Sequence, residues 1–351
     1  MENKKVLLGM SGGVDSSVSA ILLQNQGYDV VGVTLKLCAS ENLSTEEDTS
    51  IEAKKICDEF KIPHFIFDYE KEFKKYIIDD FINCYANCKT PNPCIECNRY
   101  MKFGVMFEKA KELGCQYIAT GHYARTEYSE KYGRWILKKS KAGNKDQSYV
   151  LWNIPKETLG HILFPLADFE SKDEIRAIAL KNNLKVASKP DSEDICFIPD
   201  GNYKKFLEKN SDIKPKIGNI VNSKGELLGK HTGLYNYTIG QRKGLGISNK
   251  VPLFVIGFNP EKNEVIVGEE TELYKSEVFV GNINLLLFDK LEKPIEVDVK
   301  TRYSAKSAKA IIEQQNELIL IKFEEPQKAV TPGQSAVFYI DDIVVGGGKI
   351  L

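Results

Sequence analysis

The sequence predicts an α/β fold in its first half, a doubly wound parallel sheet, followed by smaller units that are mostly β. Apolar strand patterns alternate with helix patterns up to about residue 120. Strands that alternate with helices form parallel sheets, because short right-handed crossovers join them. The chain has 351 residues, more than one ordinary core holds, and its pattern changes after residue 205, so we expect two or three domains.

The alternation begins with an apolar strand at residues 4–10 and a helix at 15–26, which Asp15 or Ser16 caps and Gly27 ends. The same period then repeats along the chain. The other expected elements are strands at 29–37, 64–69 and 116–120 and helices at 45–60, 70–87 and 99–113, the last closed by Gly114.

Three segments follow strands or join helices at one edge of this predicted sheet. They are residues 9–17, 88–98 and 120–123. Parallel sheets of this kind bind their ligands beyond the carboxyl ends of the strands. We therefore expect the functional site at that edge.

After residue 205, short apolar stretches alternate with Gly, Asn, Asp and Pro, as in "PLFVIGFNPEKNEVIVG" and "SAVFYIDDIVVGGG". This pattern predicts mostly β structure in two small units, with a seam near residues 270–280.

The composition, with 42% hydrophobic and 28% charged residues, is that of a globular protein. The net charge of −1 argues against a strongly basic nucleic-acid binder but leaves room for local patches. Residues 201–246 carry nine Lys or Arg against three Asp or Glu, and 138–147 carry four Lys against one Asp, although solvated surface explains either patch equally well. No apolar run approaches the ~18 residues of a membrane span, and the start of the chain does not read as a signal peptide, so we expect a cytoplasmic protein without membrane contact.

The segment "GMSGGVDSS" (9–17) lies between a predicted strand and a predicted helix, where backbone N–H groups and the helix dipole favour an anion. Its paired glycines let the backbone approach a polyphosphate, and its serines add hydroxyl donors. It lacks both the lysine of a Walker A loop and the G-x-G-x-x-G spacing of a dinucleotide site. The pattern resembles the SGGxDS loop of the PP-loop ATP pyrophosphatases, which implies ATP binding, transfer of AMP to a substrate oxygen, and Asp15 near Mg²⁺ and pyrophosphate.

Four of the eight cysteines, Cys84, Cys88, Cys94 and Cys97, lie within fourteen residues, and Cys196 stands apart in "SEDICFIPD". A structural zinc site usually separates its two pairs by about 12–20 residues. Only five residues separate Cys88 from Cys94, so zinc is the less favoured interpretation. A C-x-x-C pair that opens a helix has a lowered thiol pKa, because the helix dipole stabilises the thiolate, and this favours nucleophilic or redox chemistry.

The remaining cysteines, Cys38, Cys57 and Cys115, fall within strand or helix patterns, and we expect them to be small buried hydrophobic residues. An adenylating loop beside reactive thiols suggests one reaction, in which AMP makes an oxygen replaceable and a thiolate or persulfide attacks the activated carbon. Two cysteines are needed if one carries the sulfur as a persulfide and the other releases it or closes a disulfide.

Ordered motifs along the whole chain resemble those of the tRNA-specific 2-thiouridylase (MnmA) family, which converts the wobble uridine of certain tRNAs to 2-thiouridine. They are "GMSGGVDSS", "TPNPCIECNRYMKF", "IATGHYAR", "NKDQSYVLW", "DSEDICFI", "LYNYTIGQRKGLGI", "KTRYS", "VTPGQSAVFY" and a closing "GGG". Any one motif is moderately specific, and the series is highly specific. The resemblance implies a PP-loop domain of the adenine nucleotide alpha hydrolase type over residues 1–205, a small central tRNA-binding domain over 206–275 and a C-terminal β-barrel over 276–351.

The resemblance also implies roles for individual residues. Cys97 would be the nucleophile and Cys196 the persulfide-bearing partner, supplied by a cysteine desulfurase or a sulfur-carrier protein. The residues implied to contact ATP are Gly9, Met10, Ser11, Gly12, Gly13, Val14, Asp15, Ser16, Leu35 and Gly121.

A further set of residues is implied to contact the tRNA anticodon loop. Lys145 and Arg302 suit phosphates, and Tyr303 and His122 offer rings for a base that leaves its stack. Those implied to meet the target base are Asn92, Pro93 and Cys94, and those implied to meet other parts of the tRNA are His122, Lys145, Asp146, Gln147, Arg302, Tyr303 and Gln334.

Cys94 departs from the family pattern, because many members have Asp at this position. The change removes a carboxylate that would handle a proton and creates a set of three thiols, Cys94, Cys97 and Cys196. Three Cys ligands could hold a [4Fe–4S] cluster with one iron free for sulfide, a route used by some related tRNA thiolases. We favour the persulfide route, because Cys97 and Cys196 alone satisfy it.

Two rival interpretations stay open at this point. Another PP-loop activator, such as an amide-forming synthetase, would adenylate a small acid and use ammonia, and would need no paired cysteines. A non-enzymatic, metal-dependent RNA-binding protein would use Cys84, Cys88, Cys94 and Cys97 as ligands and would leave "SGGVDSS" unexplained.

Overall fold

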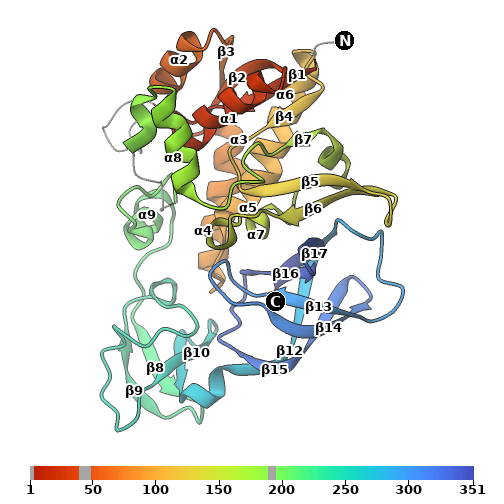
Figure 1. The fold of residues 1–351 in the computed structure, drawn as a ribbon. Coiled ribbons are helices and arrows are strands. Elements are labelled where there is room, and N and C mark those ends of the chain that lie inside the picture. Colours follow the sequence, from red (N-terminus) through yellow and green to blue (C-terminus); the bar gives the residue numbers. More distant parts are fainter. Residues whose placement is uncertain (1–3, 39–48, 189–194) are drawn as a thin grey trace. The chain divides into compact units, whose positions relative to one another are not determined.

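A computed structural model describes residues 4–38, 49–188 and 195–351 (Figure 1). The chain divides into two compact units, and each is built from segments that are distant in sequence. The first unit comprises Met1–Ile78, Cys94–Gly201 and Asp342–Val344, and the second comprises Asp79–Pro93, Asn202–Asp341 and Val345–Leu351.

The first unit is built on the predicted parallel sheet, which has five strands in the order β3-β2-β1-β4-β7. Its central strand is buried on both faces, so that Val6, Leu7 and Leu8 have no exposed surface, as a parallel sheet covered by helices requires. The strands are β1 (Lys5–Gly9), β2 (Asp29–Lys36), β3 (His64–Asp68), β4 (Tyr117–Ala119) and β7 (Ile162–Leu163). The predicted fold class is therefore confirmed.

Helices α1 (Val14–Asn25) and α8 (Lys172–Lys181) pack against each other and share one apolar core with β1. Gly27 follows α1 with a φ of +82°, as the predicted helix end requires. The predicted cap is wrong, because α1 starts at Val14 and its N-cap is Gly13, without a side-chain hydrogen bond. The expected helix 45–60 is α2 (Thr49–Glu59), and residues 45–48 lie outside the described residues.

Two predicted helices contain π-helical turns. The helix expected at 70–87 consists of α3 (Glu70–Phe73), η2 (Lys74–Ile78) and α4 (Asp79–Ala86). The helix expected at 99–113 consists of α5 (Pro93–Cys97), η3 (Asn98–Val105) and α6 (Met106–Glu112).

The second of these helices begins six residues before its predicted start, at Pro93. Proline is favoured in a first helical turn, because its fixed φ suits the helix and its missing N–H would be unpaired there. The C-x-x-C pair therefore lies inside the helix rather than before it. In the π-helical segment η3, a Cβ on Gly104 would lie 2.9 Å from the Arg99 carbonyl oxygen, so the segment requires glycine at this position.

A hairpin and several short segments complete the first unit. Strands β5 (Ala124–Ser129) and β6 (Arg134–Lys139) pair antiparallel, and α7 (Ser148–Leu151) follows them along the chain. No helix of the described residues combines the length and the apolar character that crossing a membrane would require.

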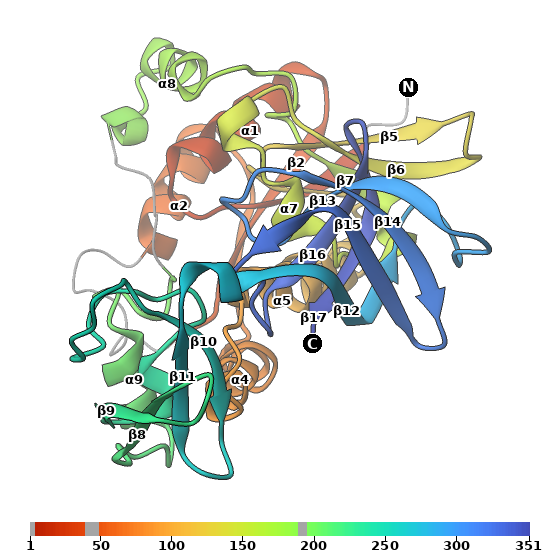
Figure 2. The ribbon, with the colours of Figure 1, turned by 90° about the horizontal axis from the view of Figure 1, so that it is seen from below.

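The second unit contains two β structures, as the change in pattern after residue 205 predicted (Figure 2). After α9 (Tyr203–Asn210) comes a four-stranded sheet in the order β10-β11-β8-β9. Its strands are β8 (Gly218–Asn222), β9 (Leu227–His231), β10 (Phe254–Asn259) and β11 (Glu264–Gly268).

Six further strands close into a β-barrel, because β12 pairs with both β15 and β17. They are β12 (Tyr274–Leu285), β13 (Ile295–Lys300), β14 (Ala308–Gln315), β15 (Leu318–Lys328), β16 (Ser335–Ile340) and β17 (Ile343–Ile350). Side chains from several of these strands, such as Val280, Ile321 and Phe338, are fully buried. The predicted β-barrel is confirmed.

Replacing Gly104 with Ala should destabilise the first unit, because the added Cβ meets a backbone oxygen that cannot rotate away. Overpacking of this kind costs about 1–3 kcal/mol. Thermal unfolding followed by circular dichroism should show a lower midpoint for Gly104→Ala than for the control Lys111→Ala, which changes an exposed position of α6. Equal midpoints for the two variants would contradict the assigned geometry of η3.

Candidate active site

The loop between β1 and α1 has the form of an anion site. Gly12 adopts a φ of +69°, which turns the chain sharply. The loop is anchored to β2, because the Met10 N–H donates to the Val33 carbonyl (2.7 Å) and the Thr34 hydroxyl donates to the Met10 carbonyl (2.8 Å). No described side chain caps α1, so its first-turn N–H groups suit the phosphates of a nucleotide.

The serines of this loop bond mainly within the loop. The hydroxyls of Ser16 and Ser17 donate to the Gly13 carbonyl at 3.1 and 2.8 Å. The Ser16 hydroxyl also accepts the Ser11 N–H at 3.3 Å. These bonds hold the turn in shape before any ligand arrives, which reduces the entropic cost of binding.

Asp15, in the first turn of α1, is held by two residues from later segments. Its carboxylate accepts the Tyr123 hydroxyl at 2.8 Å and pairs with the Lys172 ammonium at 2.6 Å. Lys172 is largely buried. A capping box of Ser171 and Glu174 marks the start of α8, but no sequence pattern relates this helix start to Asp15, so sequence reasoning missed Lys172. The Asp15 carboxylate is thus fixed at the entrance to the glycine turn.

Gly121 lies against the same helix start. A Cβ at this position would lie 3.0 Å from backbone and side-chain atoms of Asp15 and from the Ser16 nitrogen. Glycine is therefore required if the turn after β4 is to approach the loop so closely. This contact places Gly121 at the expected nucleotide site, and Leu35 lies near the carboxyl end of the neighbouring strand β2.

The thiols of Cys94, Cys97 and Cys196 lie close enough to influence one another electrostatically. The pKa of Cys97 is raised to about 12, mainly by burial, and the other two thiols contribute in the same direction. Burial also raises the pKa of Cys94 and of Cys196, although both side chains remain accessible to solvent. The prediction of a lowered thiol pKa is therefore wrong, because desolvation outweighs the helix dipole.

Lys102 opposes this effect at all three thiols, because its ammonium lowers the pKa of Cys94, Cys97 and Cys196. Its position follows from the π-helical turn, whose hydrogen bonds join residues five apart, as Cys97 and Lys102 are. The motif "NRYMKF" contains Lys102, but its role was missed because an α-helical period does not align it with Cys97.

His122 connects the lysine to the nucleotide loop. Its Nε2 accepts a hydrogen bond from the Lys102 ammonium at 3.2 Å, and its Nδ1–H donates a hydrogen bond to the Thr120 hydroxyl at 2.7 Å. Burial lowers the pKa of His122 well below its usual value, and Lys102 lowers it further, so the ring is neutral. The ring is only 9% exposed and contacts the rings of Phe103 and Phe164, so its expected contact with a tRNA base stays a prediction.

Cys38, at the end of β2, is a further neighbour of these thiols. It is buried, as expected, and burial raises its pKa to about 12, with additional contributions from Cys196 and Cys97. Sequence reasoning treated it only as a packing residue. Cys57 and Cys115 are buried, which confirms that expectation for both.

The helix that bears the thiols is anchored to the segment that contains α7. The Asn98 amide donates to the Val150 carbonyl at 2.9 Å, and the Arg99 guanidinium donates to both the backbone and side-chain oxygens of Asn153 at 3.0 and 2.8 Å. These bonds fix the helix just after Cys97 and so define where the thiol lies.

The expected RNA contacts of the first unit fall into two groups. Lys145 is exposed. The Asp146 carboxylate accepts the Ser140 N–H (2.9 Å) and the Ser148 hydroxyl (2.6 Å), and the Gln147 side chain accepts the Tyr123 N–H (3.0 Å). The last two residues therefore stabilise the loop that presents Lys145.

In the second unit, Gln334 holds the segment that leads into α5. Its amide donates to the carbonyls of Thr90 and Pro91 at 2.8 and 3.2 Å. The next residues of this segment, Asn92 and Pro93, were expected to meet the target base, and Pro93 is buried. The structure therefore gives Gln334 a positioning contact of its own.

The two other expected RNA contacts of this unit differ in exposure. The Arg302 guanidinium donates to the Ala329 carbonyl and to the Thr331 hydroxyl. Tyr303 is 41% exposed, with the Lys300 ammonium 5.8 Å from its ring centre. An exposed ring next to a cation suits a stacked base.

A metal site built from the cysteines is not supported by the described geometry. Among the described residues, no three His, Cys, Asp or Glu side chains are grouped so that they could hold a metal ion. Cys84 is buried, and Cys88 is half-buried with a φ of +56°. The described residues thus fit neither the zinc arrangement nor a cluster on Cys94, Cys97 and Cys196.

An uncapped glycine turn at the carboxyl edge of a parallel sheet, with thiols and a lysine on the helix that precedes β4, defines a PP-loop nucleotide-binding protein. Three family models match the chain. They are the tRNA methyl transferase HUP domain over residues 4–200, the tRNA methyl transferase PRC-barrel domain over 204–269 and the aminomethyltransferase beta-barrel domain over 275–350.

Full-length relatives identify the family. The chain is 49% identical to the tRNA-specific 2-thiouridylase MnmA of Caldicellulosiruptor saccharolyticus, over 99% of this chain and 98% of the relative. It is 46% identical to that of Clostridioides difficile, with the same coverage. A solved 4-thiouridine synthetase in complex with RNA and ATP matches with a TM-score of 0.39 and 21% identity, over 59% of this chain and 50% of that chain. The chain belongs to the tRNA-specific 2-thiouridylase MnmA family.

Replacing Lys102 with Met should slow alkylation of Cys97 by iodoacetamide at any pH below the thiol pKa. Removing the ammonium raises the pKa of Cys97, and each unit of increase lowers the thiolate fraction about tenfold. Peptide mass spectrometry across a pH series should show the alkylation curve of Cys97 displaced to higher pH. The control Lys111→Met should leave the curve in place, and an unmoved curve for Lys102→Met would contradict the assigned pairing.

Proposed function

We propose that the chain is an ATP-dependent sulfurtransferase that converts uridine 34, the wobble base of tRNA, to 2-thiouridine. One observation carries this proposal. Gly121 contacts the start of α1 at the nucleotide loop, and the next residue, His122, bonds to the lysine that serves the three thiols. A site for activation by ATP and a site for sulfur delivery are therefore one residue apart on the same turn.

In the activation step, the uridine O2 attacks the α-phosphate of ATP, and pyrophosphate leaves with its Mg²⁺. The base becomes adenylated at O2, so that AMP is a good leaving group. The residues proposed to hold ATP are those of the glycine turn, 9–16, together with Leu35 and Gly121. Asp15, already fixed by Lys172 and Tyr123, is proposed to face Mg²⁺ and pyrophosphate.

In the sulfur step, Cys196 carries a persulfide received from a cysteine desulfurase or a sulfur-carrier protein. The terminal sulfur attacks C2 of the activated base, and AMP leaves with the O2 oxygen. The Cys97 thiolate then attacks the Cys196 sulfur, so that a Cys97–Cys196 disulfide forms as the C2–S group is released. A dithiol reductant must reduce this disulfide before the next cycle.

Many family members have an Asp carboxylate at the position of Cys94, and this chain lacks it. Lys102 is proposed to support the chemistry in another way, by stabilising the Cys97 thiolate. The thiol of the half-buried residue Cys97 is protonated at neutral pH, because its pKa lies at about 12. A nearby ammonium stabilises the thiolate when it forms. Since His122 is neutral and tied to Thr120 and Lys102, its proposed role is to position the lysine.

We favour the persulfide route over a [4Fe–4S] cluster on Cys94, Cys97 and Cys196, because two thiols are sufficient for it. Anaerobic purification followed by iron and sulfide analysis distinguishes the two routes. A stoichiometric cluster that is required for turnover would overturn this preference.

The domains are proposed to divide the work. Residues 1–205 carry the chemistry, and residues 206–275 and 276–351 bind tRNA. The exposed residues Lys145 and Tyr303 are proposed to contact it directly. For Asn92, Pro93, Cys94, His122, Asp146, Gln147, Arg302 and Gln334, the proposal is contact with tRNA or support of the segments that make it.

Incubation with unmodified tRNA, ATP, Mg²⁺, a cysteine desulfurase with cysteine as the source of persulfide sulfur, and a dithiol reductant, followed by mass analysis of the wobble nucleoside, tests the proposed function. We expect the nucleoside to gain one sulfur in place of oxygen and pyrophosphate to be released only when tRNA is present. Pyrophosphate release stimulated by small acids instead of tRNA would favour an amide-forming synthetase. Bound zinc without any ATP turnover would favour a non-enzymatic RNA-binding protein.

Replacing Cys97 or Cys196 with Ser should abolish thiolation, because a hydroxyl can neither carry a persulfide nor release one. ATP binding, measured by calorimetry, should be retained, since neither cysteine belongs to the glycine turn. Cys88→Ser, at a half-buried cysteine, serves as the control and should thiolate normally. Retained thiolation in both active-site variants would end the assignment of the thiols.

A further inference from the structure

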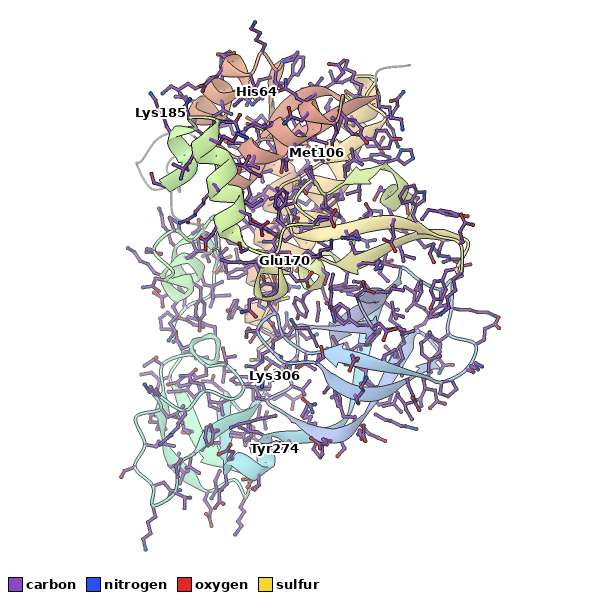
Figure 3. All side chains as sticks on the ribbon, in the orientation of Figure 1. His64, Met106, Glu170, Lys185, Tyr274 and Lys306 are labelled. Atoms are coloured by element: carbon purple, nitrogen blue, oxygen red, sulfur yellow. The ribbon has the colours of Figure 1, made fainter. Side chains whose placement is uncertain are left out.

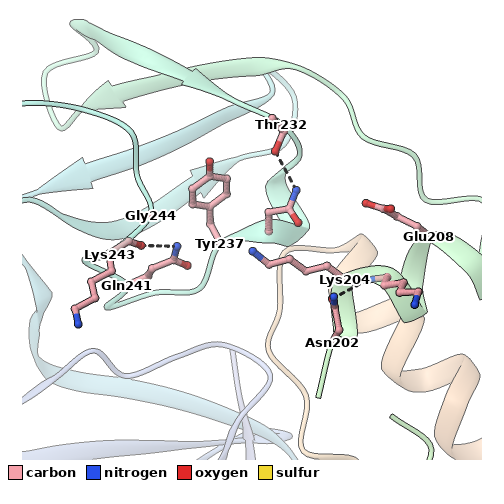
Figure 4. Close-up of a pocket in the computed structure, with 10 residues that line it drawn as sticks. Asn202, Lys204, Glu208, Thr232, Tyr237, Gln241, Lys243 and Gly244 are labelled. Atoms are coloured by element: carbon pink, nitrogen blue, oxygen red, sulfur yellow. Dashed lines mark hydrogen bonds between the residues drawn. The ribbon is translucent and has the colours of Figure 1, made fainter. Parts of the chain in front are cut away.

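A polar hollow of about 660 Å³ lies in the second unit, on a part of the chain to which the proposed chemistry assigns no residue (Figure 4). One wall is the first turn of α9, with Asn202, Lys204 and Lys205. The opposite wall consists of the loops at residues 232–237 and 241–244. We refer to it as the α9 hollow.

The α9 hollow has a positive lining. Lys204, Lys205 and Lys243 are among the residues that line it, and none of the three forms an ion pair with a described residue. Its one acidic residue, Glu208, accepts a hydrogen bond from the Tyr235 hydroxyl at 2.6 Å. The hollow therefore concentrates part of the basic excess that residues 201–246 show in the sequence.

The other side chains of the hollow are neutral hydrogen-bonding groups that are already held in place. The Asn202 side chain accepts the Lys205 N–H at 3.1 Å, which caps α9. The Gln241 amide donates to the Lys243 carbonyl at 3.0 Å, and the Asn236 amide donates to the Thr232 hydroxyl at 3.3 Å. The loops that carry these groups are thus ordered without a ligand.

The lining distinguishes between kinds of ligand. Pockets for small organic molecules are lined mainly by apolar and aromatic side chains. No aliphatic residue is among the described residues that line this hollow, and Tyr237 supplies its one aromatic ring. Lysine together with Thr, Asn, Gln and Tyr is instead the set that contacts nucleic-acid phosphates.

We propose that the α9 hollow binds backbone phosphates of the tRNA, away from the modified base. This inference rests on the proposed function, since it assigns a second contact region to the same substrate. The hollow increases the affinity for tRNA and fixes how the tRNA is positioned on the protein. It does not recognise the nucleotide sequence, because phosphates are the same at every nucleotide. A chain with a net charge of −1 thereby gains a local site for a polyanion.

The triple variant Lys204→Gln, Lys205→Gln, Lys243→Gln tests this inference. Each phosphate-binding lysine contributes about one unit to the slope of log Kd against log salt. We expect tRNA binding by the triple variant, measured by fluorescence anisotropy, to weaken at least about tenfold at ~0.1 M salt, with a slope lower by about three units. The KM for tRNA in the thiolation assay should rise by a similar factor.

The matched control is Lys55→Gln, Lys181→Gln, Lys185→Gln, which removes three charges from exposed positions that lie outside the proposed tRNA-binding domains and do not line the hollow. It should bind tRNA within about twofold of the parent. Circular dichroism and thermal unfolding of both triple variants exclude a folding defect as the cause of any loss. Equal losses in the two variants, or no loss in the hollow variant, would overturn the assignment.

Two further results separate this inference from the proposed function. A parent protein that binds tRNA but never thiolates it would refute the proposed function, while the binding comparison would still test the hollow. If the triple variant bound tRNA normally and lost sulfur transfer from a cysteine desulfurase, but kept transfer from a small-molecule persulfide, the phosphate site would be overturned in favour of an acidic protein partner.

Discussion

The structure of the active site depends on the partial burial of Cys97, which raises its thiol pKa, beside one ammonium group, that of Lys102. Burial alone would leave this thiol too weakly acidic to react, and the nearby ammonium stabilises the thiolate when it forms. The π-helical segment η3 brings these two residues together, and the bonds of Asn98 and Arg99 to the segment after β6 hold it in place. A regular α-helix over the same residues would point the lysine away from the thiol.

The need to hold the Lys102 ammonium near the thiols also explains which residues form the turn after β4. Thr120, Gly121 and His122 follow the carboxyl end of the strand, the edge at which parallel sheets bind ligands. Gly121 must lack a side chain for α1 to approach, and His122 must be buried and neutral to accept the Lys102 ammonium. The proposed nucleotide site and the proposed thiol site are thereby connected through these three consecutive residues.

Local patterns in the sequence predicted the parallel sheet, the glycine turn, the β structures that follow residue 205, and the burial of Cys57 and Cys115. These features follow from the spacing of apolar residues in strands and helices and from the positions of glycine, and such patterns extend over only a few residues. The pairing of Asp15 with Lys172, which are 157 positions apart, depends on tertiary packing and has no such pattern. The raised thiol pKa values were missed for the same reason, because the helix dipole is visible in a sequence and desolvation is not.

The residues expected to bind RNA show why residue type alone could not separate contact from support. Arginine, glutamine and histidine donate equally well to a phosphate and to a backbone carbonyl or a neighbouring side chain. In this fold Arg302 and Gln334 bond to carbonyls of their own unit, and His122 bonds to Thr120 and Lys102. Surface groups such as Lys145, Tyr303 and the lysines of the α9 hollow keep their charges or rings open to solvent. Recognition of tRNA by several small patches, each built on an internally bonded support, is consistent with a chain whose overall charge is close to zero.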